Sequence, residues 1–202
     1  DLLHKNAHFT GPVTCISIDL DNKKYSWQPF SDQIDNYKKD QNLYKNSLGN
    51  RIVFEEINHT LGLTFLYSWQ ASTKYGFVKK TKLLNHSGKE LYIKLIDGLR
   101  NILPAGVNLR TQQEMSNLAN AYKVSEGNSD YNYALYYMNA LLMDKPDPGE
   151  SLFSNIVWSC SNENIELSVN EKSISTFLSN HYFEKDHLLK GKEGSFLNYI
   201  HK

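Results

Sequence analysis

The chain has 202 residues, and its 22 basic and 22 acidic side chains give it a formal net charge of zero at pH 7. This balance argues against a nucleic-acid partner, because proteins that bind nucleic acids usually present a basic face. No apolar run approaches the roughly 18 residues that span a bilayer, so we expect a soluble protein without a membrane partner.

The first quarter of the chain predicts strands on either side of a long loop. Residues 13–20 form an apolar strand pattern, and residues 23–28 return as its hairpin partner. Residues 29–50 are polar and rich in Lys, Asp and Asn, so we expect a long loop there. Residues 51–58 then predict another strand.

Residues 61–104 are the most strongly patterned stretch. From Leu61 to Trp69 the odd positions are apolar, which gives a strand one apolar face. Residues 75–84 and 90–97 predict two further strands, the second after a turn made by Asn, His, Ser and Gly at positions 85–88. Three strands with short connections predict an antiparallel meander, a suitable sheet for a sandwich.

Two helices are predicted in the second half of the chain. Residues 111–123 have helical spacing, and Thr111 with Glu114 matches a capping box at the start. Ser168 with Glu171 matches a second capping box, before a short helix near residues 169–179.

The remaining strands complete the predicted fold. Residues 131–143 place Tyr133, Leu135 and Tyr137 on one face, and we expect this strand to pair with residues 151–160 across a Pro-rich turn at 145–149. Residues 195–200 predict the last strand. The sequence therefore indicates a mainly β fold, a single large antiparallel β-sandwich over residues 1–202 with two short helical insertions.

Three strings carry a resemblance to a known family: ASTKYGFVKKTKLLNH at 71–86, LIDGLRNILPAGVN at 95–108 and SNLANAYKVSE at 116–126. They resemble the amino-terminal domain of cellobiose-phosphorylase-like glycoside hydrolases, over roughly residues 43–194. The resemblance implies a supersandwich of the galactose-mutarotase type, which in that family precedes an (α/α)-barrel catalytic domain. The chain starts without Met and stops just after a strand, so we expect a fragment whose barrel is absent.

No catalytic residue is predicted. Glycoside hydrolysis needs two carboxyl groups that flank the scissile bond, and no carboxylate here has a diagnostic neighbourhood. In the resembled family the general acid lies on the barrel. The histidines show no HxH or HExxH spacing, so neither a metal nor a cofactor is expected. Cys15 and Cys160 lack an activating motif, and two unpaired core cysteines are favoured over a disulfide.

Carbohydrate binding is the more specific hypothesis. Trp69 and Trp158 are candidate sugar-contacting residues, because aromatic rings stack on the apolar faces of sugars. The Arg100-Asn101 corner is a further candidate, because an arginine at the exit of a strand can reach a sugar. The competing interpretation buries both tryptophans in the core and pairs Arg100 with Asp97 as scaffolding.

Three functions follow from these observations. The favoured one is a non-catalytic accessory domain of a glycoside hydrolase or phosphorylase, which packs on the (α/α)-barrel and helps to shape a site for an oligo- or disaccharide. A free-standing mutarotase-type enzyme and a sugar-binding module without a barrel are the alternatives. A homodimer and a cytoplasmic or periplasmic location both stay open.

Overall fold

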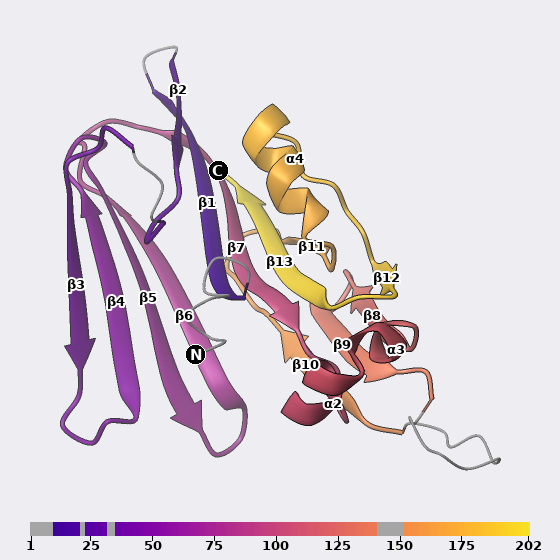
Figure 1. Ribbon diagram of the computed structural model, residues 1–202. Coiled ribbons are helices and arrows are strands. Elements are labelled where there is room, and N and C mark those ends of the chain that lie inside the picture. The colour runs from indigo at the N-terminus through magenta and orange to yellow at the C-terminus, as the bar shows by residue number, and fades with distance from the viewer. Residues whose placement is uncertain (1–9, 21–22, 32–34, 141–151) are drawn as a thin grey trace. The chain divides into compact units, whose positions relative to one another are not determined.

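A computed structural model describes residues 10–20, 23–31, 35–140 and 152–202. The fold is mainly β, as predicted, and the described residues form three antiparallel sheets and three short helices (Figure 1). Contacts within the chain divide it into two units: unit 1 comprises Asp1–Trp27 with Tyr92–Lys202, and unit 2 comprises Gln28–Leu91. A supersandwich that spans both units remains a prediction.

Unit 2 contains one four-stranded antiparallel sheet in the order β3-β4-β5-β6. Its strands are β3 (Lys39–Lys45), β4 (Arg51–Asn58), β5 (Leu63–Ser72) and β6 (Gly76–Asn85). The predicted strands at 51–58, 61–69 and 75–84 are confirmed. The loop predicted over residues 29–50 is wrong, because it contains β3. This strand lies at the sheet edge and almost all of its residues are exposed, so its sequence lacks the apolar alternation of a half-buried strand.

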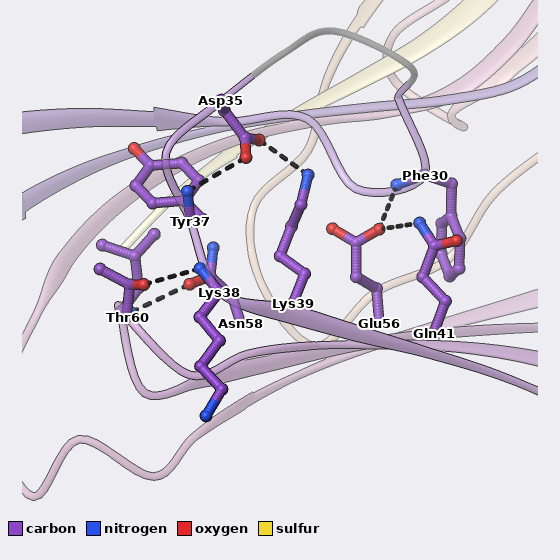
Figure 2. A network of polar contacts seen from close by, with 10 residues as sticks. Phe30, Asp35, Tyr37, Lys38, Lys39, Gln41, Glu56, Asn58 and Thr60 are labelled. Atoms are coloured by element: carbon purple, nitrogen blue, oxygen red, sulfur yellow. Dashed lines mark hydrogen bonds and ion pairs between the residues drawn. The ribbon is translucent and has the colours of Figure 1, made fainter.

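A buried carboxylate anchors the segment before β3 to this sheet. Glu56 is fully buried, and its Oε2 accepts hydrogen bonds from the Phe30 backbone N–H at 2.8 Å and from Gln41 Nε2 at 2.7 Å. The Phe30 ring then packs edge-on against Tyr67, with ring centres 5.4 Å apart. Figure 2 shows this network beside a second one, in which Asp35 accepts from the Tyr37 N–H and from Lys39 Nζ. Glu56 therefore has a structural role.

Unit 1 is built from two sheets. The five-stranded sheet has the order β11-β13-β7-β1-β2, with β1 (Gly11–Leu20), β2 (Lys23–Trp27), β7 (Tyr92–Ile102), β11 (Glu166–Ser168) and β13 (Gly194–His201). The four-stranded sheet has the order β10-β9-β8-β12, with β8 (Lys123–Asn128), β9 (Tyr133–Met138), β10 (Ser154–Trp158) and β12 (Leu188–Lys190). Buried Ala134 and Tyr136 of one sheet cluster with Leu167 and Phe196 of the other, so the two sheets pack face to face as a sandwich.

The predicted pairing of residues 131–143 with 151–160 is confirmed. β9 and β10 are antiparallel, with Tyr133 opposite Trp158, and the predicted turn at 145–149 lies outside the described residues. The buried face, however, is not the one with Tyr133, Leu135 and Tyr137. The alternate residues face the core, because the Tyr136 hydroxyl donates to the Ser195 backbone oxygen at 2.8 Å and this tyrosine can therefore be buried.

The first predicted helix is two shorter ones, α2 (Leu109–Glu114) and α3 (Ser116–Asn120). Met115 separates them, with φ −132° and ψ 28°. The capping residue is Asn108, whose side-chain oxygen accepts from the Thr111 N–H at 2.9 Å, so the box predicted at Thr111 is wrong. Strand β8 follows directly, between the predicted helix and the strand predicted at residues 131–143, where no strand was predicted. Its residues Lys123 and Ser125 are polar but buried, which conceals the strand in the sequence.

The second predicted helix is confirmed as α4 (Lys172–Asn180). Its predicted cap is wrong, because Ser168 ends strand β11 and instead forms a hydrogen bond between its hydroxyl and that of Ser173 at 2.8 Å. α4 lies on the face of the five-stranded sheet opposite the sandwich core, where Phe177 packs with Cys15 and Leu197 (Figure 1). The five-stranded sheet is thus covered on one face by a sheet and on the other by a helix.

The two cysteines are free, as predicted, but only Cys15 lies in the core; Cys160 follows β10 and is exposed. Burial raises the pKa of the Cys15 thiol to about 12; nearby Arg100 lowers it and Asp97 raises it.

We expect one thiol per chain to react with Ellman's reagent at pH 8 under native conditions and both to react in denaturant, because the thiolate is the nucleophile and the Cys15 thiol is buried and protonated in the folded chain. Cys160→Ser should abolish the fast reaction, and two fast thiols in the native protein would contradict the buried position of Cys15.

Candidate functional site

The predicted sugar-contacting residues lie in three different sheets. Trp69 is half-buried on β5 of unit 2, between Ile52 of β4 and Lys79 of β6. Trp158 is on β10 of unit 1 and is 46% exposed, so the competing interpretation that buries it in the core is wrong. The odd-numbered residues of β9 and the even-numbered residues of β10 directly opposite them point away from the sandwich core, which explains this exposure.

Arg100 and Asn101 are on β7 of unit 1, in the five-stranded sheet. The ion pair of Arg100 is with Glu171 next to α4, at 4.0 Å, and not with Asp97 as predicted. Asp97 is three residues away along a strand, so its side chain points to the opposite face, where it accepts from the Thr14 hydroxyl at 2.7 Å. Burial lowers the pKa of Arg100, while Glu171 raises it.

Asn101 has a backbone role. Its φ of 51° is left-handed, a conformation that Asn tolerates better than most residues. Its N–H donates to the Ser195 hydroxyl at 3.4 Å, where the pairing register of β7 and β13 shifts between Gly194 and Phe196. Asn101 therefore accommodates a β-bulge in this strand pair.

A groove in unit 1 brings together residues that can recognise a ligand, and we call it the Tyr199 groove. It has a volume of about 430 Å³, within the range of small-molecule sites. It lies on the face of the five-stranded sheet that α4 covers, beyond the end of this helix. The strands contribute Tyr92, Lys94, Glu166, Tyr199 and His201, and the segment after α4 contributes His181, Tyr182, Phe183 and Lys185.

Strand pairing explains why the first set of side chains converges. Tyr199 and His201 are two residues apart on β13, so both point to one face. Glu166 of β11 is directly opposite Tyr199, and Lys94 of β7 is directly opposite His201. Residues opposite each other in an antiparallel pair share a face, so three adjacent strands present these four side chains together.

The end of α4 supplies the other wall. His181 caps the helix with φ 54°, and its N–H donates to the Phe177 oxygen at 2.8 Å. This left-handed cap turns the chain, and Phe183 then stacks on Tyr199 with ring centres 5.0 Å apart and planes 10° apart. The result is a buried aromatic floor beneath two exposed tyrosines, Tyr92 at 48% and Tyr182 at 63% exposure.

The polar groups of the groove are unevenly paired. Glu166 forms an ion pair with Lys185 at 2.9 Å. Within the described part of the chain, Lys94 has no carboxylate partner, and the buried Nδ1 of His181 has no hydrogen-bond partner. Burial, together with Tyr92 and Glu166, raises the pKa of Tyr199, so its phenol stays a neutral hydrogen-bond donor at neutral pH. The groove therefore combines aromatic faces with several donors.

Sequence reasoning missed this groove. Its residues are scattered from position 92 to position 201 and form no motif. The available signal was the alternation of Tyr199 and His201 in the last strand, but its meaning depends on which strands lie beside it. The spacing of the histidines in the sequence is a signal for metal sites, and it does not show that side chains from distant strands meet in one groove.

The described residues contain neither a candidate metal-binding group nor a candidate membrane-spanning helix. Among them, no group of three or more His, Cys, Asp and Glu side chains is placed to hold a metal ion. None of the described helices is long and apolar enough to span a bilayer. In the Tyr199 groove the one carboxylate is Glu166, whereas glycoside hydrolysis uses two.

Comparisons with known proteins add no identity: no protein-family model matches the chain, and no curated protein matches it.

Proposed function

We propose that this chain is a non-catalytic accessory domain of a carbohydrate-active enzyme, and that it binds an oligo- or disaccharide in the Tyr199 groove. The observation that carries the proposal is the meeting of two exposed tyrosines, Tyr92 and Tyr182, with polar side chains in a groove that also contains the buried Phe183–Tyr199 stack. Sugar rings have apolar C–H faces that stack on aromatic rings and hydroxyls that need hydrogen-bond partners. A groove with both features suits this class of ligand.

The resemblance of residues 71–126 to cellobiose-phosphorylase-like enzymes supports the same proposal. In that setting the domain packs on an (α/α)-barrel that carries the catalytic acid, and the parent protein is a glycoside hydrolase or phosphorylase. Trp69, Trp158 and the Arg100-Asn101 corner then contribute to packing or to the shape of the sugar site.

A mutarotase-type enzyme is the second candidate, because such a reaction needs a histidine and a glutamate that converge in one sheet. Glu166 and His201 both line the Tyr199 groove from the five-stranded sheet. The ion pair between Glu166 and Lys185 argues against a free general base. Polarimetry of freshly dissolved α-glucose distinguishes the two: accelerated mutarotation that Glu166→Gln abolishes would favour the enzyme.

The binding proposal is tested with exposed groove residues, whose removal leaves the core intact. We expect Tyr92→Ala with Tyr182→Ala to weaken the binding of cellobiose or a related disaccharide by about tenfold, because two stacking surfaces are lost. Calorimetric titration measures this. Tyr131→Ala is the matched control, since Tyr131 is 76% exposed and does not line the groove.

Two results would contradict the proposal. Equal losses in the groove variant and in Tyr131→Ala would place the sugar elsewhere. Turnover of a disaccharide clearly above background, with or without phosphate, would show that the chain is catalytic by itself.

A further inference from the structure

We propose that the Tyr199 groove selects an acidic sugar unit, one that carries a carboxylate or a phosphate ester. This inference rests on the proposed carbohydrate function and adds the charge of the ligand. It starts from the balance of charges around the groove, which lies in a protein whose formal net charge is zero.

The groove contains two lysines, Lys94 and Lys185, and one acidic residue, Glu166, and the charges of Lys185 and Glu166 neutralise each other. Lys185 Nζ is 2.9 Å from Glu166 Oε1, so this pair contributes no net charge. Lys94 is the remaining cation, and no described carboxylate pairs with it. Lys94 is half-buried, and an unpaired cation in such a position interacts favourably with an anion, since it is screened less than one in open solvent.

The position of Lys94 fits an anion that is attached to a ring. Lys94 is directly opposite His201, and the His201 ring is 5.8 Å from Tyr199, centre to centre. Lys94 therefore lies beside the end of an aromatic row that continues from His201 through Tyr199 to Phe183. A sugar ring that stacks on the exposed ring of His201 or Tyr92, both in the groove with Lys94, can extend its anionic substituent toward this lysine.

The aromatic row also argues against a small inorganic anion as the intended ligand. Inorganic phosphate has no apolar face and would leave the rings without a partner, whereas an acidic sugar uses both features. Lys94 acts as a point charge and makes no bidentate fork, so it does not distinguish a carboxylate from a phosphate ester.

The test compares matched ligands by calorimetric titration of the whole chain: methyl glucoside, methyl glucuronide, glucose 6-phosphate and inorganic phosphate. We expect the two acidic sugars to bind about tenfold more tightly than the neutral glucoside, because charge-assisted hydrogen bonds are stronger than neutral ones. Lys94→Met should remove this preference while it leaves glucoside binding nearly unchanged, and Lys94→Arg should restore it. Lys190→Met, at an exposed strand lysine outside the groove, is the control.

Each outcome decides one claim. A preference that survives Lys94→Met, or equal affinity for glucoside and glucuronide, would overturn the acidic-sugar inference and leave the proposed function standing. Inorganic phosphate that binds as tightly as glucose 6-phosphate would also overturn it, since the site would then recognise an anion alone. Failure of all three sugars and of cellobiose would refute the proposed function itself. Tighter binding of one acidic sugar than the other identifies which substituent the groove accepts.

Discussion

Gly98→Ala is expected to lower the free energy of unfolding by about 3 kcal/mol or more, because overpacking against rigid backbone is strongly destabilising. Gly98 lies within β7, which is paired with β1 on one side and with β13 on the other. A Cβ atom at this position would be 1.9 Å from the Phe196 backbone oxygen and 3.0 Å from the Leu197 Cα. Neither atom can move without displacing β13, so the variant must separate two paired strands.

Gly127→Ala is the matched control for this prediction. Its Cβ would be 3.1 Å from a Val169 methyl and 3.2 Å from a Leu167 methyl, and side chains can adjust where backbone cannot. Denaturant unfolding should give a much smaller loss for this variant, about 1 kcal/mol. Similar midpoints for the two variants would contradict the close approach of β7 and β13.

Lys123→Met is the second substitution with a large expected effect. Lys123 is 1% exposed, and its ammonium donates to Glu193, to Gln112 Oε1 at 2.9 Å and to Asn120 Oδ1 at 2.8 Å. Removal of one partner of a buried pair leaves an uncompensated charge, so we expect a loss of about 3 kcal/mol. Lys202→Met, which breaks the exposed pair with Glu163, should cost less than about 1 kcal/mol.

The same pair predicts an acid dependence of stability. Burial alone would raise the pKa of Glu193, but hydrogen bonds and the charge of Lys123 lower it below the ordinary value of 4.5. The folded pKa is therefore below the unfolded one, so the stabilisation is present above about pH 4.5 and is lost as the pH falls through the folded pKa. Unfolding measured from pH 7 to pH 3 should show the effect of Lys123→Met shrink at acid pH. An effect of constant size across this range would contradict the ionised pair.

Strands with one apolar face could be predicted from the sequence. Strand β5 has Leu63 and Phe65 at alternate positions, and both are buried. Strand β3 could not be predicted, because an exposed edge strand has no face that requires apolar residues. The face of β9 was misassigned because both of its faces are rich in tyrosine and leucine, and the partner of the Tyr136 hydroxyl, at position 195, decides which is buried.

The Tyr199 groove could not be predicted, because it depends on neighbours far apart in the sequence. Lys94 and His201 are adjacent only through the pairing of β7 with β13, and Glu166 and Tyr199 only through the pairing of β11 with β13. The wall at His181 depends on the left-handed backbone conformation of this residue, and a histidine at that position does not predict such a conformation. Aromatic content motivated the carbohydrate hypothesis, whereas strand pairing determined where the aromatic rings meet polar groups.

The most direct test of the central claim is to map the sugar-binding surface by NMR, with the isotope-labelled chain titrated with methyl glucuronide and cellobiose. The account predicts backbone shift changes that concentrate in three segments, around Lys94, across residues 181–185 and around Tyr199, and that saturate with the calorimetric affinity. Changes centred on Trp158 or on Trp69 would contradict the assignment of the groove, and a spectrum that neither sugar alters would contradict carbohydrate binding by this chain.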